Sequence, residues 1–511
     1  MTAATDTNIP FGTTLQRGLN GAELFAVAVL AATLLAKLWV VFGVGLDGDE
    51  AYYAMWSAYL SPGYLDHPPG IAVAIAAGRL LAGDTVLGVR LLPLVFGLVT
   101  LLALYRTTRL LVPGRTPAAL AVSWYCLSGQ AALSLVATPD SPSILFWMLS
   151  LWAAAEAVTA KRPTWWLLVG VFAGAGLASK YTNAWLGVGL VLYLLATPEG
   201  RRQLGHWQLW AGGALALAVF SPVLWWNYQH DWRSFLFQGA RITSTESGRG
   251  NLTLEFVVSQ AAFLGPVMLV CALLAIVGYF FGLGRRQGAN LALPVLTTLP
   301  LLGYFLFHSL HSRVETNWTH PVAPVLALLG VAFVCLLPRA RGWLVPVATA
   351  AHAIIGASVI AFIYVQAVLH PLNLGVVDRT GLLRGWEGVS TGVREAADAA
   401  GAKVIWTEAS YQVTGELFFH GRAEGDPRPV RDIVQHERYD FIPPGERFPA
   451  EMPAVLVRRA ASPQAAVELS PRPEFGSSRL VAVVPRDDGH RREYYAVFAV
   501  SEPTAAFPGT D

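Results

Sequence analysis

Charged residues are scarce in this chain. Acidic and basic side chains make up 14% of the 511 residues, whereas hydrophobic side chains make up 54% and the mean hydropathy is +0.47. This composition excludes an ordinary soluble protein of that length and indicates a polytopic membrane protein. The formal net charge of +2 is too small to indicate a nucleic-acid partner.

Cysteine is scarcer still, with only Cys126, Cys271 and Cys335 in the chain. Each lies in an apolar run, so the sequence predicts neither a disulfide framework nor a metal–thiolate site. A cleavable signal peptide is also not expected, because a polar stretch precedes Ala22 and the apolar run that begins there is long enough to span a bilayer. We expect residues 1–21 to be a cytoplasmic N-terminal segment.

Long apolar runs dominate residues 22–370, and a bilayer span needs about 20 such residues. Lysines and arginines in the short connections occur at alternate connections, as expected if all of them face the cytoplasm. We therefore predict a polytopic α-helical domain with about eleven transmembrane helices in a bacterial inner membrane. The predicted spans are 22–44, 86–106, 117–137, 142–160, 165–179, 182–197, 207–226, 255–283, 290–308, 319–337 and 343–367.

Two of these spans, 165–179 and 182–197, are short. Merging them would move every later basic pair to the opposite side of the membrane, so we expect two helices that meet at Lys180. The apolar segment 71–82 is too short to cross and is expected to lie in the membrane interface. With this topology the catalytic residues belong to outer loops, at 44–85, 137–141, 227–253 and 309–318.

Charged residues concentrate at the end of the chain, where 36 of the 70 acidic and basic residues follow His370. Short helical and β-branched runs replace the long apolar ones there. We expect residues 371–511 to form a soluble extracytoplasmic α/β domain, and its lack of a nucleotide-binding glycine loop favours a role as a lid or an acceptor platform. The helix-like runs are 394–400 and 411–419, and the strand-like runs are 403–407, 454–457, 480–484 and 494–500.

The first polar segment after the first apolar run crowds acids against aromatic residues. It begins with GDEAYY at 48–53 and continues to the DHPPG sequence at 66–70. A partly desolvated carboxylate suits a general base for a hydroxyl group, whereas a pair of adjacent acids can instead hold a divalent cation. Asp49 and Glu50 are therefore catalytic candidates, and the pattern leaves open whether they act as a general base or bind a divalent cation. A simpler interpretation is that they belong to a solvated loop without a catalytic role.

Two further charged residues lie at predicted outer turns. Asp140, in TPDSP at 138–142, can be a helix N-cap or a second catalytic acid. Lys180 interrupts an apolar hairpin, where an unpaired ammonium costs about 2–3 kcal/mol on insertion scales. It is expected either to extend toward the interface without a function or to bind an anion, and a lipid phosphate shared with Arg241 is the natural one.

Tryptophan near a membrane interface is ordinarily an anchor. The exceptions here lie beside asparagine, histidine and glutamate, and sugar rings need such aromatic faces combined with hydrogen-bonding groups. The predicted substrate-binding residues are Tyr52, Tyr53, Asn227, His230, Glu315, Asn317 and Trp318.

Taken in order, six motifs over residues 20–370 resemble those of polyprenyl-phosphate-dependent glycosyltransferases with the GT-C fold. The likeness is to the bacterial branch that is similar to protein O-mannosyltransferases and the lipid A aminoarabinose transferase. It implies a hexosyl- or pentosyltransferase that takes a sugar from a polyprenyl phosphate and transfers it to an extracytoplasmic glycolipid such as lipid A, a polysaccharide or a protein. The motifs are GDEAYY at 48–53, GYLDHPP at 63–69, TPDSP at 138–142, GLASKY at 176–181, SP at 221–222 with WN at 226–227, and ETNW at 315–318.

The resemblance also implies roles for single residues. Asp49 matches the acid associated with acceptor activation, Asp140 matches the acid of the second outer loop, and Lys180 matches a basic residue near the donor phosphate. In the aminoarabinose transferases the position similar to Asp66 is a metal-binding glutamate followed by lysine. Asp66 and His67 stand there in this chain, so the resemblance implies a divalent metal site whose ion stays open.

Two functions are therefore hypotheses for this chain. In an inverting glycosyltransferase, Asp49 takes the acceptor proton and polyprenyl phosphate leaves C1 of the sugar against Lys180, Arg241 or a metal. The alternative is a transporter or flippase for a lipid-linked sugar, but transporters usually place their polar site near the bilayer midplane between internal repeats. The polar residues here follow one rim and show no repeat, which favours the transferase. The sugar, the acceptor and the oligomeric state stay open.

Overall fold

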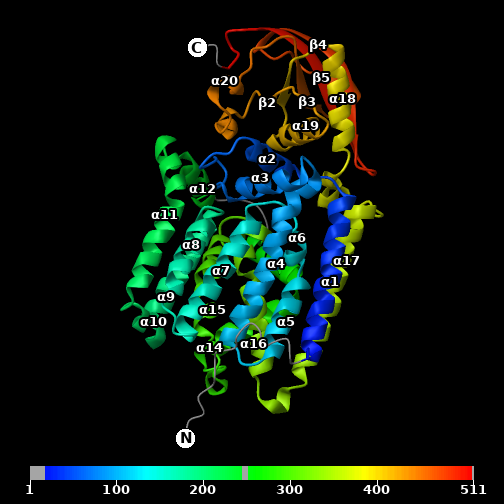
Figure 1. Cartoon of the computed structure of the whole chain (residues 1–511). Coiled ribbons are helices and arrows are strands. Elements are labelled where there is room, and N and C mark those ends of the chain that lie inside the picture. Colours follow the sequence, from blue (N-terminus) through cyan, green and yellow to red (C-terminus); the bar gives the residue numbers. More distant parts are fainter. Residues whose placement is uncertain (1–17, 244–250, 509–511) are drawn as a thin grey trace.

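The computed structural model describes residues 18–243 and 251–508. Long helices form a bundle, and a smaller α/β domain lies on one end of that bundle (Figure 1). We call this end of the bundle the domain end. The predicted division into a helical body and a C-terminal α/β part is therefore seen in the structure.

Six helical segments are long and apolar enough to cross a membrane, and a bent pair of helices makes a seventh if it is counted as one span. The chain is thus a mostly helical membrane protein, as its composition indicates. The six are α1 (Gly21–Gly43), α4 (Val86–Leu111), α7 (Asp140–Thr159), α11 (Trp207–Gln229), the run Thr316–Leu336 that contains α16 (Ala323–Leu336), and α17 (Leu344–Leu369).

Shorter apolar helices account for most of the other predicted spans. They are α8 (Trp165–Leu177), α9 (Ala184–Ala196) and α15 (Ala292–His308). The predicted pair of helices on either side of Lys180 is observed, since α8 ends before it and a 3₁₀ turn at Tyr181–Asn183 leads into α9. The predicted total of eleven crossings stays a prediction, because length and composition alone support six or seven.

Two predicted spans are not continuous helices. The span 117–137 divides into α5 (Arg115–Cys126) and α6 (Gly129–Leu133), because Ser128 between them caps α6 by accepting a hydrogen bond from Ala131 N. The span 255–283 divides into α13 (Leu252–Leu264) and α14 (Pro266–Phe280), which meet at 108°. Gly265 adopts a positive φ of 88° and Pro266 has no amide hydrogen, so a straight helix cannot continue through them.

Glycine allows α8 and α11 to pack in close contact. A Cβ atom added to Gly170 on α8 would lie 1.9 Å from the carbonyl oxygen of Gly212 on α11. Membrane helices associate through such small residues because lipid supplies no hydrophobic drive between them. This contact fixes two helices whose domain ends lead to Lys180 and Asn227.

Two short helices, α2 (Gly48–Ala58) and α3 (Gly70–Ala82), lie between the bundle and the C-terminal domain (Figure 1). The predicted helix over 71–82 is thus present at the domain end of the bundle. The backbone of α2 lies directly against α19 (Tyr411–Ala423) of the C-terminal domain, because a Cβ on Gly415 would be 2.6 Å from Tyr52 N. One glycine therefore sets how closely the two parts dock.

The C-terminal domain contains a five-stranded sheet in the order β2-β1-β3-β5-β4. β1 runs parallel to β2 and β3, whereas β5 is antiparallel to its neighbours β3 and β4. Both helix-like runs and all four strand-like runs predicted after His370 correspond to elements here, and the short strand β2 was missed. The strands are β1 (Val404–Glu408), β2 (Val430–Asp432), β3 (Ala454–Ala460), β4 (Phe475–Asp487) and β5 (Arg492–Pro503), and the helices beside α19 are α18 (Trp386–Ala399), α20 (Pro444–Arg447) and α21 (Pro463–Val467).

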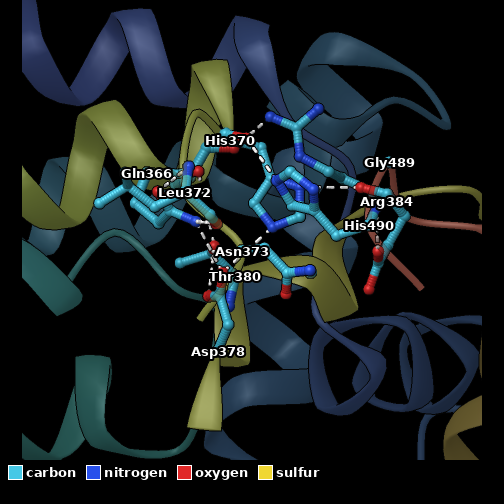
Figure 2. Close-up of polar contacts among 12 residues, drawn as sticks. Gln366, His370, Leu372, Asn373, Asp378, Thr380, Arg384, Gly489 and His490 are labelled. Carbon is cyan, nitrogen blue, oxygen red and sulfur yellow. Dashed lines mark hydrogen bonds and ion pairs between the residues drawn. The ribbon is translucent and has the colours of Figure 1, made fainter. Parts of the chain in front are cut away.

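The chain leaves the bundle at His370, which follows α17 with a left-handed φ of 49°. Its Nε2 lies 3.1 Å from Asp378 Oδ2, and Gln366 Nε2 donates to the same oxygen at 2.7 Å, as Figure 2 shows. His370 Nδ1 lies 2.8 Å from the carbonyl oxygen of Asp488 in the turn between β4 and β5. These bonds connect the end of α17 to the turn between β4 and β5 in the C-terminal domain.

Candidate active site

A cavity of about 910 Å³ lies between the domain end of the bundle, α2 and the C-terminal domain. Most of the residues predicted from the sequence line it, although they come from six separate segments of the chain. The lining also includes residues of the C-terminal domain that the sequence did not suggest, chiefly Tyr411 and Arg438. The predicted residues in the lining are Asp49, Tyr52, Tyr53, Asp66, His67, Asp140, Lys180, Arg241, Glu315, Asn317 and Trp318.

Asp49 lies in the first turn of α2 and is partly buried. Its Oδ1 atom accepts a hydrogen bond from Tyr411 Oη at 3.0 Å and another from Gln412 Nε2 at 2.9 Å. Among the residues that the structure describes, none donates a hydrogen bond to Oδ2. The side chain is therefore held through one oxygen while the other can accept a proton.

Glu50, the second acid of this pair, does not line the cavity, and its side chain is fully buried. Arg90 of α4 contacts both of its oxygens, with Nη2 2.6 Å from Oε2 and Nε 2.9 Å from Oε1. The backbone amides of Asp47 and Ala137 also donate to this carboxylate, at 2.9 and 2.8 Å. The catalytic role predicted for Glu50 is therefore not supported, because its carboxylate is fully engaged in joining α2, α4 and the segment that leads to Asp140.

Lys180 and Asp140 form a buried ion pair at 2.6 Å in the cavity wall. Asn317 Nδ2 donates to the other carboxylate oxygen of Asp140 at 2.8 Å. Of the two alternatives for Lys180, extension toward the interface or pairing with an anion, the structure shows pairing, and the anion is Asp140 inside the protein. The lipid phosphate expected as its partner stays a prediction. The alternative that Asp140 caps α7 is wrong, because it is the first residue of the helix and makes no capping bond.

Asp66 is held by the C-terminal domain. Arg438 Nη1 lies 2.5 Å from Asp66 Oδ1, and Tyr52 Oη donates to Oδ2 at 3.1 Å. His67 follows it in the lining, and burial together with the nearby cations Lys180 and Arg241 lowers the pKa of its imidazole to about 3. His67 is thus neutral at physiological pH.

The donor set does not fit the metal site implied at Asp66 and His67. A guanidinium group already occupies the position beside Asp66 that a divalent cation would take. Within residues 18–243 and 251–508, no group of three or more histidine, cysteine, aspartate or glutamate side chains is arranged to hold a metal ion. No step of the chemistry is therefore assigned to a metal.

The predicted substrate residues fall into two groups. Glu315, Asn317 and Trp318 line the cavity, and the guanidinium of Arg241 lies 5.2 Å from the ring centroid of Trp318. Asn227 and His230 are outside the lining. Asn227 is buried at the end of α11, and its Nδ2 lies 3.5 Å from the hydroxyl of Tyr181.

His230 stacks on Trp226, with 4.1 Å between the ring centroids, and its Nδ1 lies 2.8 Å from the Trp226 carbonyl oxygen. It therefore terminates α11 rather than facing the cavity. Asn227 does not line the cavity, but its hydrogen-bond partner Tyr181 does. Part of the predicted loop 227–253 lies outside the described residues.

Comparison with known proteins identifies relatives by sequence. Residues 66–226 match the family described as dolichyl-phosphate-mannose-protein mannosyltransferase. The chain is similar to the lipid A galacturonosyltransferase RgtD of Rhizobium johnstonii, with 25% identity over 395 residues that cover 75% of this chain and 80% of that protein. It is also similar to the lipopolysaccharide core galacturonosyltransferase RgtB of the same organism, with 25% identity over 39% of this chain and 41% of that protein.

Solved structures share the fold at lower sequence identity. ArnT from Cupriavidus metallidurans in the apo state has a TM-score of 0.59 and 18% identity, covering 93% of this chain and 98% of that chain. The same protein bound to undecaprenyl phosphate also has a TM-score of 0.59, with 17% identity over the same shares. The archaeal oligosaccharyltransferase AglB from Archaeoglobus fulgidus has a TM-score of 0.50 and 11% identity, covering 85% of this chain and 69% of that chain. The fold and the class of enzyme expected from the sequence are thereby confirmed.

Proposed function

We propose that this chain, a glycosyltransferase with the GT-C fold, moves a sugar from a polyprenyl-phosphate donor to a glycolipid acceptor on the extracytoplasmic side of a bacterial inner membrane. One observation carries the proposal. A single cavity at the domain end of the bundle holds a carboxylate with an available oxygen, Asp49, and a cluster of cations that includes Lys180 and Arg241. A base and an anion site in one cavity are what transfer from a phosphate-linked donor requires.

Asp49 acts as the general base in this proposal. Its Oδ2 takes the proton of the acceptor hydroxyl while the acceptor oxygen forms a bond to C1 of the sugar. The bond between C1 and the phosphate oxygen breaks, and its electron pair leaves with polyprenyl phosphate. Attack from the face opposite the leaving group inverts the configuration at C1. The hydrogen bonds from Tyr411 and Gln412 to Oδ1 support this role, because they orient the carboxylate.

Lys180 and Arg241 receive the departing phosphate. A lysine ammonium group has three N–H donors. One donor of Lys180 forms a hydrogen bond to Asp140 Oδ1. The remaining donors can bind phosphate oxygens, whose charge grows as the glycosidic bond breaks. Asp140 then holds the ammonium in position, so we assign it a positioning role instead of that of a second base.

The named relatives guide the choice of substrates to test. Those relatives are galacturonosyltransferases acting on lipid A and on the lipopolysaccharide core. We therefore propose a hexuronic acid as the sugar and lipid A or the lipopolysaccharide core as the acceptor. Lys180, Arg241 and Arg379 line the part of the cavity that we assign to the donor, and these cations support a donor that carries a phosphate and a carboxylate, although Lys180 is already paired with Asp140.

The proposal also includes the finer topology. The alternating basic connections support eleven crossings, with the cavity and the C-terminal domain outside the cytoplasm. The shorter helices α8, α9 and α15 then complete the membrane domain beside the six long segments. Tilt and snorkelling allow helices shorter than the bilayer to cross it.

Mass spectrometry of envelope glycolipids tests the function. A strain that lacks this chain is compared with the same strain carrying the wild-type chain or the variant Asp49→Asn. We expect the wild-type chain alone to add one sugar mass to lipid A or the core. Translocation of a lipid-linked sugar in vesicles without any new glycoside would instead support the flippase.

A further inference from the structure

The C-terminal domain places a fixed cation on a carboxylate of the first outer loop. Arg438 lies in the 3₁₀ helix His436–Tyr439, and its Nη1 is 2.5 Å from Asp66 Oδ1. The two side chains are 21% and 13% exposed, so water screens this pair only weakly. The contact spans 372 positions of sequence, which means that it exists only when the C-terminal domain is docked.

Neighbouring aromatic residues hold the guanidinium in place. Its Cζ atom lies 4.6 Å from the ring centroid of Tyr411 and 5.6 Å from that of Phe237. The hydroxyl of Tyr52 lies 3.1 Å from Asp66 Oδ2 and 3.2 Å from the backbone oxygen of Arg438. Both carboxylate oxygens of Asp66 are thus engaged, and the arginine is fixed at its side chain and at its backbone.

Both carboxylate oxygens of Asp66 already have a partner, so a second cation would have to compete with Arg438 and Tyr52. A divalent ion there would have to displace a guanidinium that is stacked, partly buried and paired. It would then find Asp66 and His67 as adjacent ligands, and no third ligand of a suitable type is grouped with them in the described part of the chain. Arginine keeps its charge at every physiological pH, so it supplies a permanent positive charge without needing an ion from solution.

The same arginine is coupled to the proposed base. Tyr411 packs under the Arg438 guanidinium with its ring and donates a hydrogen bond to Asp49 Oδ1 with its hydroxyl. Loss of Arg438 therefore removes a charge from the cavity and also loosens the residue that orients Asp49.

We propose that Arg438 takes the place of a divalent cation in this active site, so that the enzyme works without a metal and its site is complete only with the C-terminal domain docked. For its activity readout this inference rests on the function proposed above. Its metal readout is independent of that function.

The test uses the purified full-length protein after dialysis against EDTA. Bound metal is measured by elemental mass spectrometry, and sugar transfer is measured with and without added Mn²⁺ or Zn²⁺. We expect the wild-type protein to hold no stoichiometric metal and to be unaffected by EDTA. Arg438→Ala should lose about tenfold or more in turnover, and added metal should restore part of it because the carboxylate of Asp66 is then released. Arg438→Lys should keep some metal-free activity, since it retains the charge but not the planar stacking.

Two controls test whether Arg438 replaces a cation in the active site or only helps to attach the C-terminal domain to the bundle. Arg422→Ala removes another contact between the C-terminal domain and the bundle, the pair of Arg422 with Asp84 at 3.4 Å, and should leave turnover within about twofold of the wild type because exposed pairs contribute little. The double variant Arg438→Ala with Asp66→Asn should lose the metal response that Arg438→Ala gains. Thermal unfolding of each variant identifies any that fail to fold, and Arg438→Lys then carries the comparison.

Three results would overturn the inference. They are a stoichiometric metal in the wild type, inactivation of the wild type by EDTA, or full metal-free activity in Arg438→Ala. If no form of the protein transfers a sugar, the proposed function fails instead. Metal binding by Arg438→Ala but not by the wild type would still support the substitution of a metal by Arg438.

Discussion

Tyr411 of the C-terminal domain donates a hydrogen bond to Asp49 of α2 at 3.0 Å, across 362 positions of sequence. The domain therefore contributes directly to the proposed active site rather than only covering it. Because Gln412 donates to the same oxygen, the carboxylate is oriented by two neighbouring residues of α19. A movement of this domain changes the geometry of the proposed base.

Replacing the proposed base gives the first prediction. Asp49→Asn should lower turnover by about 10²–10⁴-fold, because an amide cannot take the acceptor proton. Donor binding should change little, since the amide oxygen can still accept the bonds from Tyr411 and Gln412. Asp231→Asn is the matched control, because Asp231 is exposed and lies outside the cavity lining. Steady-state transfer rates and donor titrations on both variants decide the matter, and normal turnover in Asp49→Asn would remove it as the base.

The buried pair of Lys180 and Asp140 gives the second prediction. Lys180→Ala should lower donor affinity and turnover, and it should also destabilise the protein by about 3–5 kcal/mol by leaving a buried carboxylate unpaired. The double variant Lys180→Ala with Asp140→Asn should regain most of that stability without regaining turnover. Lys180→Arg should keep part of both functions. Recovery of turnover in the double variant would show that the lysine serves only to neutralise Asp140.

Composition revealed the membrane body because a bilayer imposes apolar runs of about 20 residues, as in α1 and α17. The break at Ser128 and the sharp bend at Gly265 were missed, since a single small or polar residue barely changes the mean hydropathy of a run. Strand β2 was missed for a related reason. Its three residues, Val430–Asp432, are too few to show any alternation.

The cavity residues of the bundle were predictable because a charge such as Lys180 or Asp140 stands out in an apolar surrounding. Arg438 and Tyr411 did not stand out, because a soluble domain carries many arginines and tyrosines on its surface. Only the docking of α19 against α2 brings them to Asp49 and Asp66. One signal was available in principle, because Gly415 lies within an otherwise helix-like run and such a glycine usually needs a packing reason.

The buried pair of Glu50 and Arg90 gives the third prediction. Glu50→Ala should destabilise the protein by about 3–5 kcal/mol, because it leaves the buried guanidinium without its partner. Activity per folded molecule should fall far less than in Asp49→Asn, since Glu50 holds α2 in place from outside the cavity. Thermal unfolding and turnover normalised to folded protein distinguish the two cases. A Glu50 variant that is as stable as the wild type but inactive would contradict this prediction and indicate a catalytic role for Glu50.

The last prediction concerns pH and the contact between α19 and α2. Glu416 on α19 is 1% exposed, and in the described structure neither of its carboxylate oxygens accepts a hydrogen bond. The pKa of Glu416 is raised to about 7: burial is the largest cause, His420, 3.5 Å away, opposes it in part, and the charges of Asp47 and Glu50 add to it. Between its ordinary value of 4.5 and about 7, the folded protein keeps a proton that the unfolded chain has lost. Stability must therefore fall as the pH rises through this window.

The expected loss is on the order of 3 kcal/mol between pH 4.5 and 7, from a shift of about two to three pKa units. Glu416→Gln should remove this dependence and make the protein more stable than the wild type above pH 7, because an uncharged amide stays in the contact at every pH. Glu395→Gln on the exposed face of α18 is the matched control and should follow the wild-type curve. Melting temperatures of the detergent-solubilised protein from pH 4.5 to 8.5 provide the measurement. Parallel curves for Glu416→Gln and the wild type would mean that the folded protein does not hold an extra proton on Glu416 at neutral pH.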